Sequence, residues 1–402
     1  MRLLLALFLG LCGTHTLAGS PDWSERELRI LKSLSLSALA PIPGSPSNRV
    51  ADDPQAAAFG RQLFFDPRFS RNGQLSCASC HQPDKHFTDQ RKVGIGIGQT
   101  MRNTPTVVGS GWLHWFYWDG RRDSLWSQAL IPFESPDEMG SSRTHVIREI
   151  SRDADLRRQY ETLYGALPLE LTVEPRHLHA SPMGDRASRD RWYRLPDDKK
   201  HKINRVFSNI GKAIAAYERT LIPTATRFDR YVEQLSGVED HDIVLTAQER
   251  SGIELFIDPA KTQCMQCHNG ALLANGGFHN VGSGSFYEGT LDFGRSLGLQ
   301  AAIIDEFNCL GNYSDASKVD CHQLRFADTS HPQDGAFKTP SLRNLGMTAP
   351  YFHDGRFDTL SDVMHYYNQP PTNNGPHELR PLQLNDEQLA AIVAFLDMLN
   401  EE

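Results

Sequence analysis

The apolar residues of this chain recur mainly with the period of an α-helix. Between Ile203 and Leu221 they return every three or four positions, which predicts an amphipathic helix. Its expected buried face consists of Val206, Ile210, Ala213, Ile214, Tyr217 and Leu221. The preceding stretch, residues 180–202, carries many charges, so we expect it to be an insertion on the surface.

The end of the chain shows the same period. A helix is expected to start near Asn385 or Asp386, because either residue can cap a helix N-terminus. The residues that this helix should bury are Leu389, Ile392, Val393, Leu396 and Leu399. Together these patterns predict a mainly α protein with few strands.

The first residues have the pattern of an export signal. Arg2 supplies a positive charge, residues 3–12 are apolar but too few to cross a bilayer, and Thr16–Ala18 offers small residues for cleavage. We therefore expect a signal peptide at residues 1–18, cleaved near Ala18, and a periplasmic mature protein without a membrane span. The net charge of −8 and the lack of a long basic run argue against nucleic acid as a partner.

Two pentads of the form Cys-x-x-Cys-His carry the clearest chemistry. In such a pentad the two thiols add to the vinyl groups of one haem, and the imidazole of the next residue binds the iron. A zinc site would need four suitable ligands, and a redox-active cysteine pair would not need the histidine. The sequence therefore predicts two covalently bound haem c groups. The attachment residues are Cys77, Cys80, Cys264 and Cys267, and the iron ligands are His81 and His268.

Two cysteines, Cys309 and Cys321, remain outside the pentads and the signal. In an oxidising compartment such a pair is most simply a disulfide, and the alternative is two buried free thiols. Closing so short a loop would contribute about 3 kcal/mol to stability.

A weak internal repeat follows the pentads. The segments TPTV and FYWDGRRDSL in the first half match TPSL and YFHDGRFDTL in the second, and 14 residues separate Pro105 from Asp119 and Pro340 from Asp354 alike. This spacing predicts one cytochrome c unit used twice. We expect an N-terminal domain at 19–238 and a C-terminal domain at 239–402, with a boundary near 236–242. The second copy contains a 48-residue insertion, because 28 residues separate Cys77 from Pro105 but 76 separate Cys264 from Pro340.

The repeat also predicts that one haem has a second protein ligand and the other does not. An expected helix at residues 361–368 offers Met364, His365, Tyr366 and Tyr367 as ligands. The position equivalent to Tyr367 in the first half is Pro132, which has no donor atom. An open iron beside a capped one suggests catalysis at the first haem and electron storage at the second.

These features resemble the bacterial di-haem cytochrome c peroxidase and MauG superfamily. The resemblance covers nearly all of the mature chain, and its segments are LFFDPRFSRNGQLSCASCH, RNTPTV, FYWDGRRDSLWSQALIPFESPDEMG, CMQCHNG and FKTPSLRNLGMTAPYFHDGRFDTL. It implies two cytochrome c-like domains with one calcium ion between them. It also implies an enzyme that reacts with hydrogen peroxide at the haem of the first pentad.

The resemblance assigns roles to individual positions. Gln128, Pro132 and Glu138 match residues that line the distal pocket of the peroxide haem, and Trp118 matches a tryptophan that relays electrons between the haems. The implied calcium ligands are Asn103, Thr348 and Pro350, and the implied ligand of the second haem is Tyr367.

Alternatives remain at two of these positions. A carboxylate near the open face can move a proton from the inner to the outer peroxide oxygen, which suits Glu138, but Glu134 and Asp137 are close rivals. Trp118 lies in a cluster with three other tryptophans, and aromatic clusters usually serve core packing. Those neighbours are Trp112, Trp115 and Trp126.

Two departures from the ordinary peroxidases of the family point in one direction. Those enzymes have methionine at the position of Tyr367, and many have a blocking histidine at the position of Ile95. A phenolate is a hard anionic ligand that favours high-valent iron, and an unblocked haem should need no reductive activation. Both features resemble MauG-type enzymes, which oxidise side chains of a partner protein. Residues 305–310 resemble the MbnH-like branch, which converts a tryptophan of a copper-binding partner to kynurenine.

The expected function is therefore a peroxide-dependent oxidase that acts on a tryptophan or tyrosine of a partner protein. One alternative is a cytochrome c peroxidase that draws electrons from a small cytochrome c or a cupredoxin. The other is a non-enzymatic di-haem electron carrier.

Overall fold

The structure is a computed structural model that describes residues 23–168, 179–238, 241–284, 291–330, 333–372 and 375–401. The expected signal peptide lies outside these residues. Within the described ranges, no helix is both long enough and apolar enough to cross a membrane.

The described residues are mainly helical, as the sequence predicts, and they include one short antiparallel strand pair. The helices are α1 (Glu25–Leu34), α2 (Pro54–Phe65), α3 (Cys77–Cys80), α4 (Leu125–Gln128), α5 (Ile131–Glu134), α6 (Arg143–Arg152), α7 (Ala154–Tyr164), α8 (Arg186–Tyr193), α9 (Asp197–Glu218), α10 (Arg227–Leu235), α11 (Ala247–Ile257), α12 (Cys264–Cys267), α13 (Arg295–Ile304), α14 (His322–Arg325), α15 (Leu360–Asn368) and α16 (Asp386–Asp397). The strands are β1 (Phe278–His279) and β2 (Phe337–Lys338).

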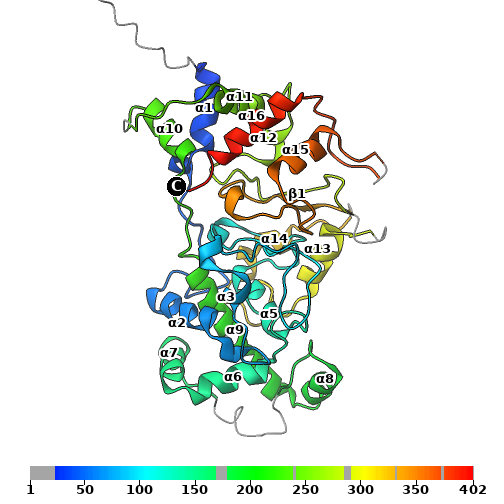
Figure 1. The fold of residues 1–402 in the computed structure, drawn as a ribbon. Helices are drawn as coiled ribbons and strands as arrows, with labels where there is room; N and C mark the ends of the chain where they lie inside the picture. The colour runs from blue at the N-terminus through cyan, green and yellow to red at the C-terminus, as the bar shows by residue number, and fades with distance from the viewer. Residues whose placement is uncertain are drawn as a thin grey trace, which may run out of the picture.

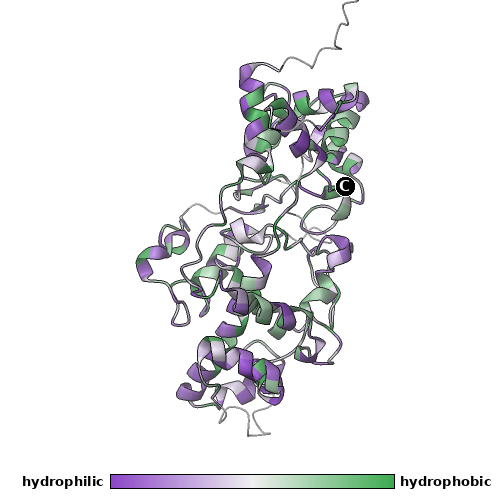
Figure 2. Cartoon of the chain, turned by 90° about the vertical axis from the view of Figure 1, so that its left-hand side faces the viewer, coloured by the Kyte–Doolittle hydropathy of each residue, from purple (hydrophilic) through white to green (hydrophobic). Residues whose placement is uncertain are grey.

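The molecule is elongated and has two lobes, with α2 and α6–α9 toward one end and α1, α10, α11, α15 and α16 at the other (Figure 1). Each lobe is built on one pair of crossing helices, α2 with α9 and α11 with α16. A glycine makes each crossing close. A Cβ at Gly60 would lie 1.8 Å from the carbonyl oxygen of Ala213, and a Cβ at Gly252 would lie 1.9 Å from that of Ala391. Figure 2 shows that helices at both ends of the molecule carry apolar green segments beside polar purple ones.

The two cores are not continuous in the sequence. Leu31 and Leu34 of α1 and Phe228 of α10 lie in the core of the second lobe, with α11 and α16. In the opposite direction, Phe307 and Tyr313 of the second-half insertion lie in the core of the first lobe. The division at residues 238 and 239 stays a prediction, but segments on both sides of it pack in the other lobe.

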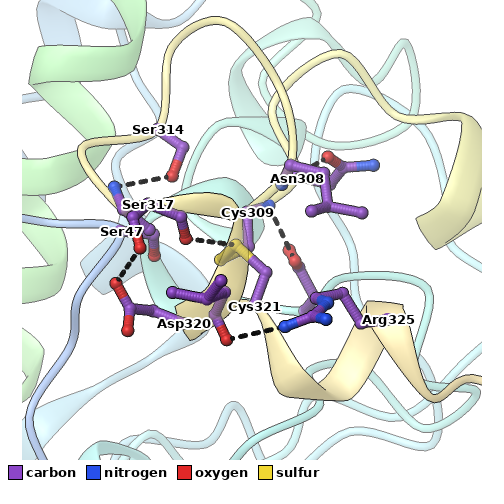
Figure 3. The surroundings of a disulfide bond; sticks show 12 residues. Ser47, Asn308, Cys309, Ser314, Ser317, Asp320, Cys321 and Arg325 are labelled. Carbon is purple, nitrogen blue, oxygen red and sulfur yellow. Dashed lines mark hydrogen bonds between the residues drawn. A yellow bond between two sulfur atoms is a disulfide. The ribbon is translucent and has the colours of Figure 1, made fainter.

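Ion pairs fix the insertion to the first lobe, and a disulfide closes a loop within the insertion. Arg143 contacts Glu306 at 2.6 Å, and Lys212, which is buried, contacts Asp315 at 2.8 Å. The leftover cysteines are joined in the structure, where the disulfide Cys309–Cys321 has a Cα–Cα distance of 5.6 Å. Figure 3 shows this bridge beside Ser47, whose carbonyl oxygen accepts the main-chain N–H of Asp315 at 3.2 Å, so the insertion is also tied to the first lobe by main-chain contact.

The two expected long helices are present, with shifted ends. α9 starts at Asp197 rather than near Ile203. Asp197 and Asp198 lie in its first turn, where the positive end of the helix dipole stabilises their negative charges. α16 starts after Asn385, whose side chain accepts the main-chain N–H of Gln388 at 2.9 Å. The expected buried faces are buried except for Val393 and Leu221, which are half-buried.

The prediction that residues 180–202 form a surface insertion is wrong in part. Ala180, Ser181, Trp192 and Leu195 are buried in the first lobe. Ser181 donates a hydrogen bond to Glu134 at 2.6 Å, and the indole of Trp192 packs under a buried arginine at 4.9 Å. The charged residues between these positions led to the prediction of a surface segment, but the segment covers a buried ion pair.

Candidate active site

Both pentads fold into single helical turns that present an oriented imidazole. Nδ1 of His81 lies 3.1 Å from the carbonyl oxygen of Phe87, and Nδ1 of His268 lies 2.9 Å from that of Leu273. A carbonyl accepts only from a protonated nitrogen, so these contacts assign the proton to Nδ1 and leave Nε2 free to bind a metal. Burial lowers the pKa of both imidazoles, to about 4 for His268, which keeps them neutral as iron ligands must be.

The four pentad cysteines are free of disulfides and are suited to haem attachment. Burial raises the pKa of the Cys77 thiol strongly and that of Cys80 to about 11, so both stay protonated at neutral pH. Two neutral thiols on one helical turn, followed by an imidazole with a free nitrogen, are the donor set that haem c requires.

The internal repeat is also present in three dimensions. Phe116 pairs with Arg122, and Tyr351 pairs with Phe357, in two isolated antiparallel bridges at matching positions. In both copies the residue after the first partner has a positive φ, 67° in the first and 72° in the second. The same sequence spacing therefore produces the same turn in both halves.

The helix after each turn begins alike but continues differently. Ser124 caps α4, and Thr359 caps α15 at the equivalent position. α4 ends at Gln128, and the chain restarts as α5 with Pro132 in its first turn. α15 continues without a break through Tyr367 to its end. The first-lobe position equivalent to Tyr367 is Pro132, which lies beyond the end of α4.

Among the four candidate ligands on α15, the contacts favour Tyr367. The hydroxyl of Tyr366 donates to the carbonyl oxygen of Val281 at 2.8 Å, Met364 is buried in the second core, and His365 is exposed. Burial raises the pKa of the Tyr367 hydroxyl, and after burial the largest contributions come from the nearby pentad thiols of Cys264 and Cys267. Tyr367 therefore lies on the side of α15 that faces the second pentad.

A cavity over the first pentad brings the predicted distal residues together. The volume of this cavity is about 40 Å³. Its lining includes Cys77, Cys80, His81, Gln128, Pro132 and Glu138. The residues expected at the distal face thus line one pocket together with the pentad.

The contacts of the three acidic candidates separate them. Glu134 is buried in an ion pair with Arg143 at 3.0 Å, and Asp137 is exposed. Glu138 is half-buried and lines the cavity, where burial raises its pKa. A carboxyl group with a raised pKa holds a proton more readily than an ordinary carboxylate, which suits proton transfer at this site.

Comparison with known proteins agrees with this geometry. Residues 54–236 match the family model described as di-haem cytochrome c peroxidase. The cytochrome c peroxidase IdrP2 of Denitromonas iodatirespirans is 30% identical over 355 residues, which are 85% of this chain and 81% of that protein. The chain belongs to the di-haem cytochrome c peroxidase and MauG family.

Two further relatives lie on the MauG side of this family. The methylamine utilization protein MauG of Methylorubrum extorquens is 29% identical over 387 residues, which are 95% of this chain and 87% of that protein. A crystal structure of a MauG-like protein associated with microbial copper homeostasis superposes with a TM-score of 0.60 at 26% identity. That match covers 90% of this chain and 95% of the other. The protein is therefore a di-haem peroxidase-family enzyme whose relatives include both MauG proteins and cytochrome c peroxidases.

Trp118 contacts residues from both halves of the chain. Its Nε1 donates to the carbonyl oxygen of Asn103 at 3.0 Å, and its own carbonyl oxygen accepts the main-chain N–H of Lys338, in β2, at 2.8 Å. Of the other tryptophans, Trp126 is fully buried against the insertion and donates to Ser47 at 2.9 Å.

The segments expected to hold calcium lie beside one another in the structure. The main-chain N–H of Asn103 donates to the carbonyl oxygen of His353 at 2.8 Å, which brings residue 103 beside the segment that contains Thr348 and Pro350. The described ranges contain no cluster of three His, Cys, Asp or Glu side chains suited to a metal. Carbonyl and amide oxygens can bind calcium without such a cluster, so the site stays a prediction.

Glu218 also lines the cavity, and it is not among the site residues predicted from the sequence. Its side chain is 3% exposed, and its Oε2 has no hydrogen-bond partner among the described residues. Burial raises its pKa to about 8. The signal was available in the sequence, because Glu218 follows Ile214 by four positions on the apolar side of α9.

Proposed function

We propose that this protein is a MauG-like oxidase, which uses hydrogen peroxide to oxidise a tryptophan or tyrosine of a partner protein. The observation that carries the proposal is the asymmetry of the repeat. Pro132 occupies the first-lobe position at which the second lobe presents Tyr367, so the first lobe would offer a haem no donor atom there and the second would offer a phenol.

Two bound haem c groups would supply the redox chemistry of this reaction, and the chain's residues would prepare it. Pro132 keeps a donor atom away from the open face, and Gln128 can orient a peroxide molecule by hydrogen bonding. Glu138 accepts a proton from the inner peroxide oxygen and returns it to the outer one, which makes the outer oxygen a good leaving group. The raised pKa of Glu138 suits both directions of this transfer.

The other residues would move and hold oxidising equivalents. Trp118 joins the lobes through its contacts with Asn103 and Lys338, which suits an electron relay. Tyr367 would bind the second iron as a hard anionic ligand, and such a ligand lowers the potential of an iron and favours its oxidised states.

Three further features belong to the proposal. The mature protein would be periplasmic, with residues 1–18 removed on export. Each lobe would be a cytochrome c-like domain with one haem. Asn103, Thr348 and Pro350 would hold one Ca²⁺ between the lobes, where it would fix the distance across which electrons move.

One other activity has specific support. A relative with 30% identity over 85% of this chain is a cytochrome c peroxidase, which favours reduction of peroxide with electrons from a small cytochrome c or cupredoxin. The two functions separate by turnover. Rapid steady consumption of peroxide with a reduced cytochrome c or cupredoxin would favour the peroxidase, whereas oxidation of a protein substrate without such a donor favours the MauG-like oxidase.

Electron paramagnetic resonance of the resting, fully oxidised protein tests the proposal. We expect one high-spin ferric haem, which is open, and one low-spin ferric haem, which is capped. Substitution Tyr367→Ala should alter only the low-spin signal, and the matched control Tyr366→Phe should alter neither, because the Tyr366 hydroxyl is used by Val281. Two low-spin signals in the resting protein would refute the proposal, and so would a Tyr367→Ala spectrum identical to that of the wild type.

A further inference from the structure

A glycine-rich loop packs against the main chain of Glu138, the proposed proton-transfer residue. In residues 94–98, with the sequence Gly-Ile-Gly-Ile-Gly, the main-chain N–H of Ile97 donates to the carbonyl oxygen of Glu138 at 2.8 Å. The N–H of Gly98 donates to the carbonyl oxygen of Asp137 at 3.0 Å. The N–H of Gly96 donates to the oxygen of Gly98 at 2.9 Å, which closes the tip of the loop on itself.

The glycines in this loop allow its main chain to approach a neighbouring main chain closely, and they are not required by an unusual turn. Gly94, Gly96 and Gly98 all have φ values outside the left-handed region. A Cβ at Gly96 would lie 2.4 Å from the carbonyl oxygen of Glu138 and 2.6 Å from that of Asp137, distances that real Cβ atoms do not show. Because both obstacles are main-chain atoms, a side chain at position 96 must push the loop and Glu138 apart.

The neighbouring glycine makes an informative contrast. A Cβ at Gly98 would meet the side-chain oxygen Oδ1 of Asp137 at 2.6 Å, and that exposed side chain can turn away. Position 98 therefore tolerates a methyl group more easily than position 96.

The other end of the loop reaches the haem attachment site. The carbonyl oxygen of Ile95 lies 3.9 Å from Sγ of Cys80, and the base of the loop is closed by two bonds, from Thr100 to Gly94 at 2.9 Å and from Gly94 to Arg102 at 3.1 Å. The loop thus connects a fixed point beside the first pentad to the main chain of Glu138, and Gly96 and Glu138 line the same cavity.

We propose that loop 94–98 is a clamp that holds Glu138 over the first haem in the resting enzyme, and that Gly96 is the positioning residue on which the clamp depends. The inference rests on the proposed function of Glu138 and adds a cause for it. A carboxyl group held in place before the reaction needs no rearrangement to act, which fits an enzyme that reacts with peroxide while fully oxidised.

A double-mutant cycle with peroxide and the fully oxidised enzyme tests this role. The variants are Gly96→Ala, Glu138→Gln and the two combined, and the controls are Gly98→Ala and Gly44→Ala, where nothing lies within 4 Å of an added Cβ. Glu138→Gln should slow the reaction by about 10²-fold to 10⁴-fold. Gly96→Ala should slow it by about 10²-fold, because a misplacement of about 1 Å has that effect.

The decisive result is the combined variant. If Gly96 acts through Glu138, the double variant should react at the rate of Glu138→Gln within about twofold. The reason is that displacing the side chain at position 138 has no further effect once its carboxyl group is gone. The pH profile of Gly96→Ala should resemble that of Glu138→Gln, while its haem content and resting spin states stay those of the wild type. Multiplied effects, or a wild-type rate and pH profile in Gly96→Ala, would overturn the proposal.

Amide hydrogen exchange of the wild-type holoenzyme gives a test that needs no variant. The N–H groups of Ile97 and Gly98 should be protected in the oxidised enzyme, and fast exchange at both would overturn the clamp. This readout is independent of catalysis. If the wild type failed to react with peroxide, the proposed function would fall, whereas the exchange measurement would still decide whether the clamp exists.

Discussion

Substitution Glu218→Gln should make the protein more stable at neutral and alkaline pH and remove a pH dependence of folding. Glu218 is almost fully buried, and desolvation raises its pKa from the ordinary value of 4.5 to about 8. Below pH 4.5 the carboxyl group is neutral in both the folded and the unfolded chain, so its titration has no effect on stability. As pH rises above that value, the unfolded chain ionises first, and the folded state loses stability until the folded carboxyl also ionises near pH 8.

The size of the effect follows from the shift. Each pH unit between the two pKa values destabilises the folded state by about 1.4 kcal/mol, so the loss at pH 7 is about 3 kcal/mol. Glutamine has nearly the same volume and no charge, but its amide group would be buried without a full set of partners, at a cost of about 1–3 kcal/mol. The absolute stability difference is therefore less informative than its slope. Between pH 5 and pH 8 the variant should gain about 3.5 kcal/mol relative to the wild type.

Guanidinium unfolding of the haem-loaded protein at pH 5, 6, 7 and 8, followed by tryptophan fluorescence, measures this slope. The matched control is Asp190→Asn, which removes an exposed carboxylate from α8 and should leave the pH dependence unchanged. Parallel stability curves for Glu218→Gln and the wild type over this range would refute the reasoning, because they would mean that Glu218 ionises in the folded protein as easily as in the unfolded chain.

Three other predictions concern the two lobes. The double substitution Cys309→Ser with Cys321→Ser should lower the free energy of unfolding by about 3 kcal/mol, as expected for a loop with a sequence separation of 12, and an unchanged denaturation midpoint would contradict it. Gly252→Ala should destabilise by at least about 1–3 kcal/mol despite the better helix propensity of alanine, because the methyl group would meet a carbonyl oxygen of α16 at 1.9 Å; thermal melting that shows stabilisation would be inconsistent with the crossing. Arg343→Met should cost about 3–5 kcal/mol in chemical denaturation, because it leaves the buried Asp229 carboxylate without the guanidinium 2.8 Å away, and a loss below 1 kcal/mol would count against that pairing.

The sequence predicted the features whose spacing is set by covalent or local geometry. The pentads are recognisable because one haem requires two thiols and an imidazole at fixed separations. The repeat is recognisable because a turn with a positive φ and a capped helix need the same residues in both halves. Gln128, Pro132 and Glu138 were placed by family resemblance, and the structure brings them into one cavity with Cys77 and Cys80.

Features that depend on distant contacts were not predictable in this way. Nothing in the local sequence of α1 shows that Leu31 and Leu34 pack beside α10 and α11, more than 190 positions later in the chain. The segment near Trp192 was assigned to the surface because charged neighbours dominate its composition. The role of Gly96 depends on a carbonyl oxygen about 40 positions away, and a sequence pattern does not contain such a distance.

The exchange of segments between the lobes has a consequence for how the protein is made. A chain that is synthesised N-terminus first delivers α1 before the rest of the second lobe exists, and it delivers the first pentad long before Phe307 and Tyr313 complete the first core. Neither lobe can finish folding until most of the polypeptide has emerged. Final compaction of both lobes therefore becomes a late event, because each core waits for a segment that lies far away in the chain.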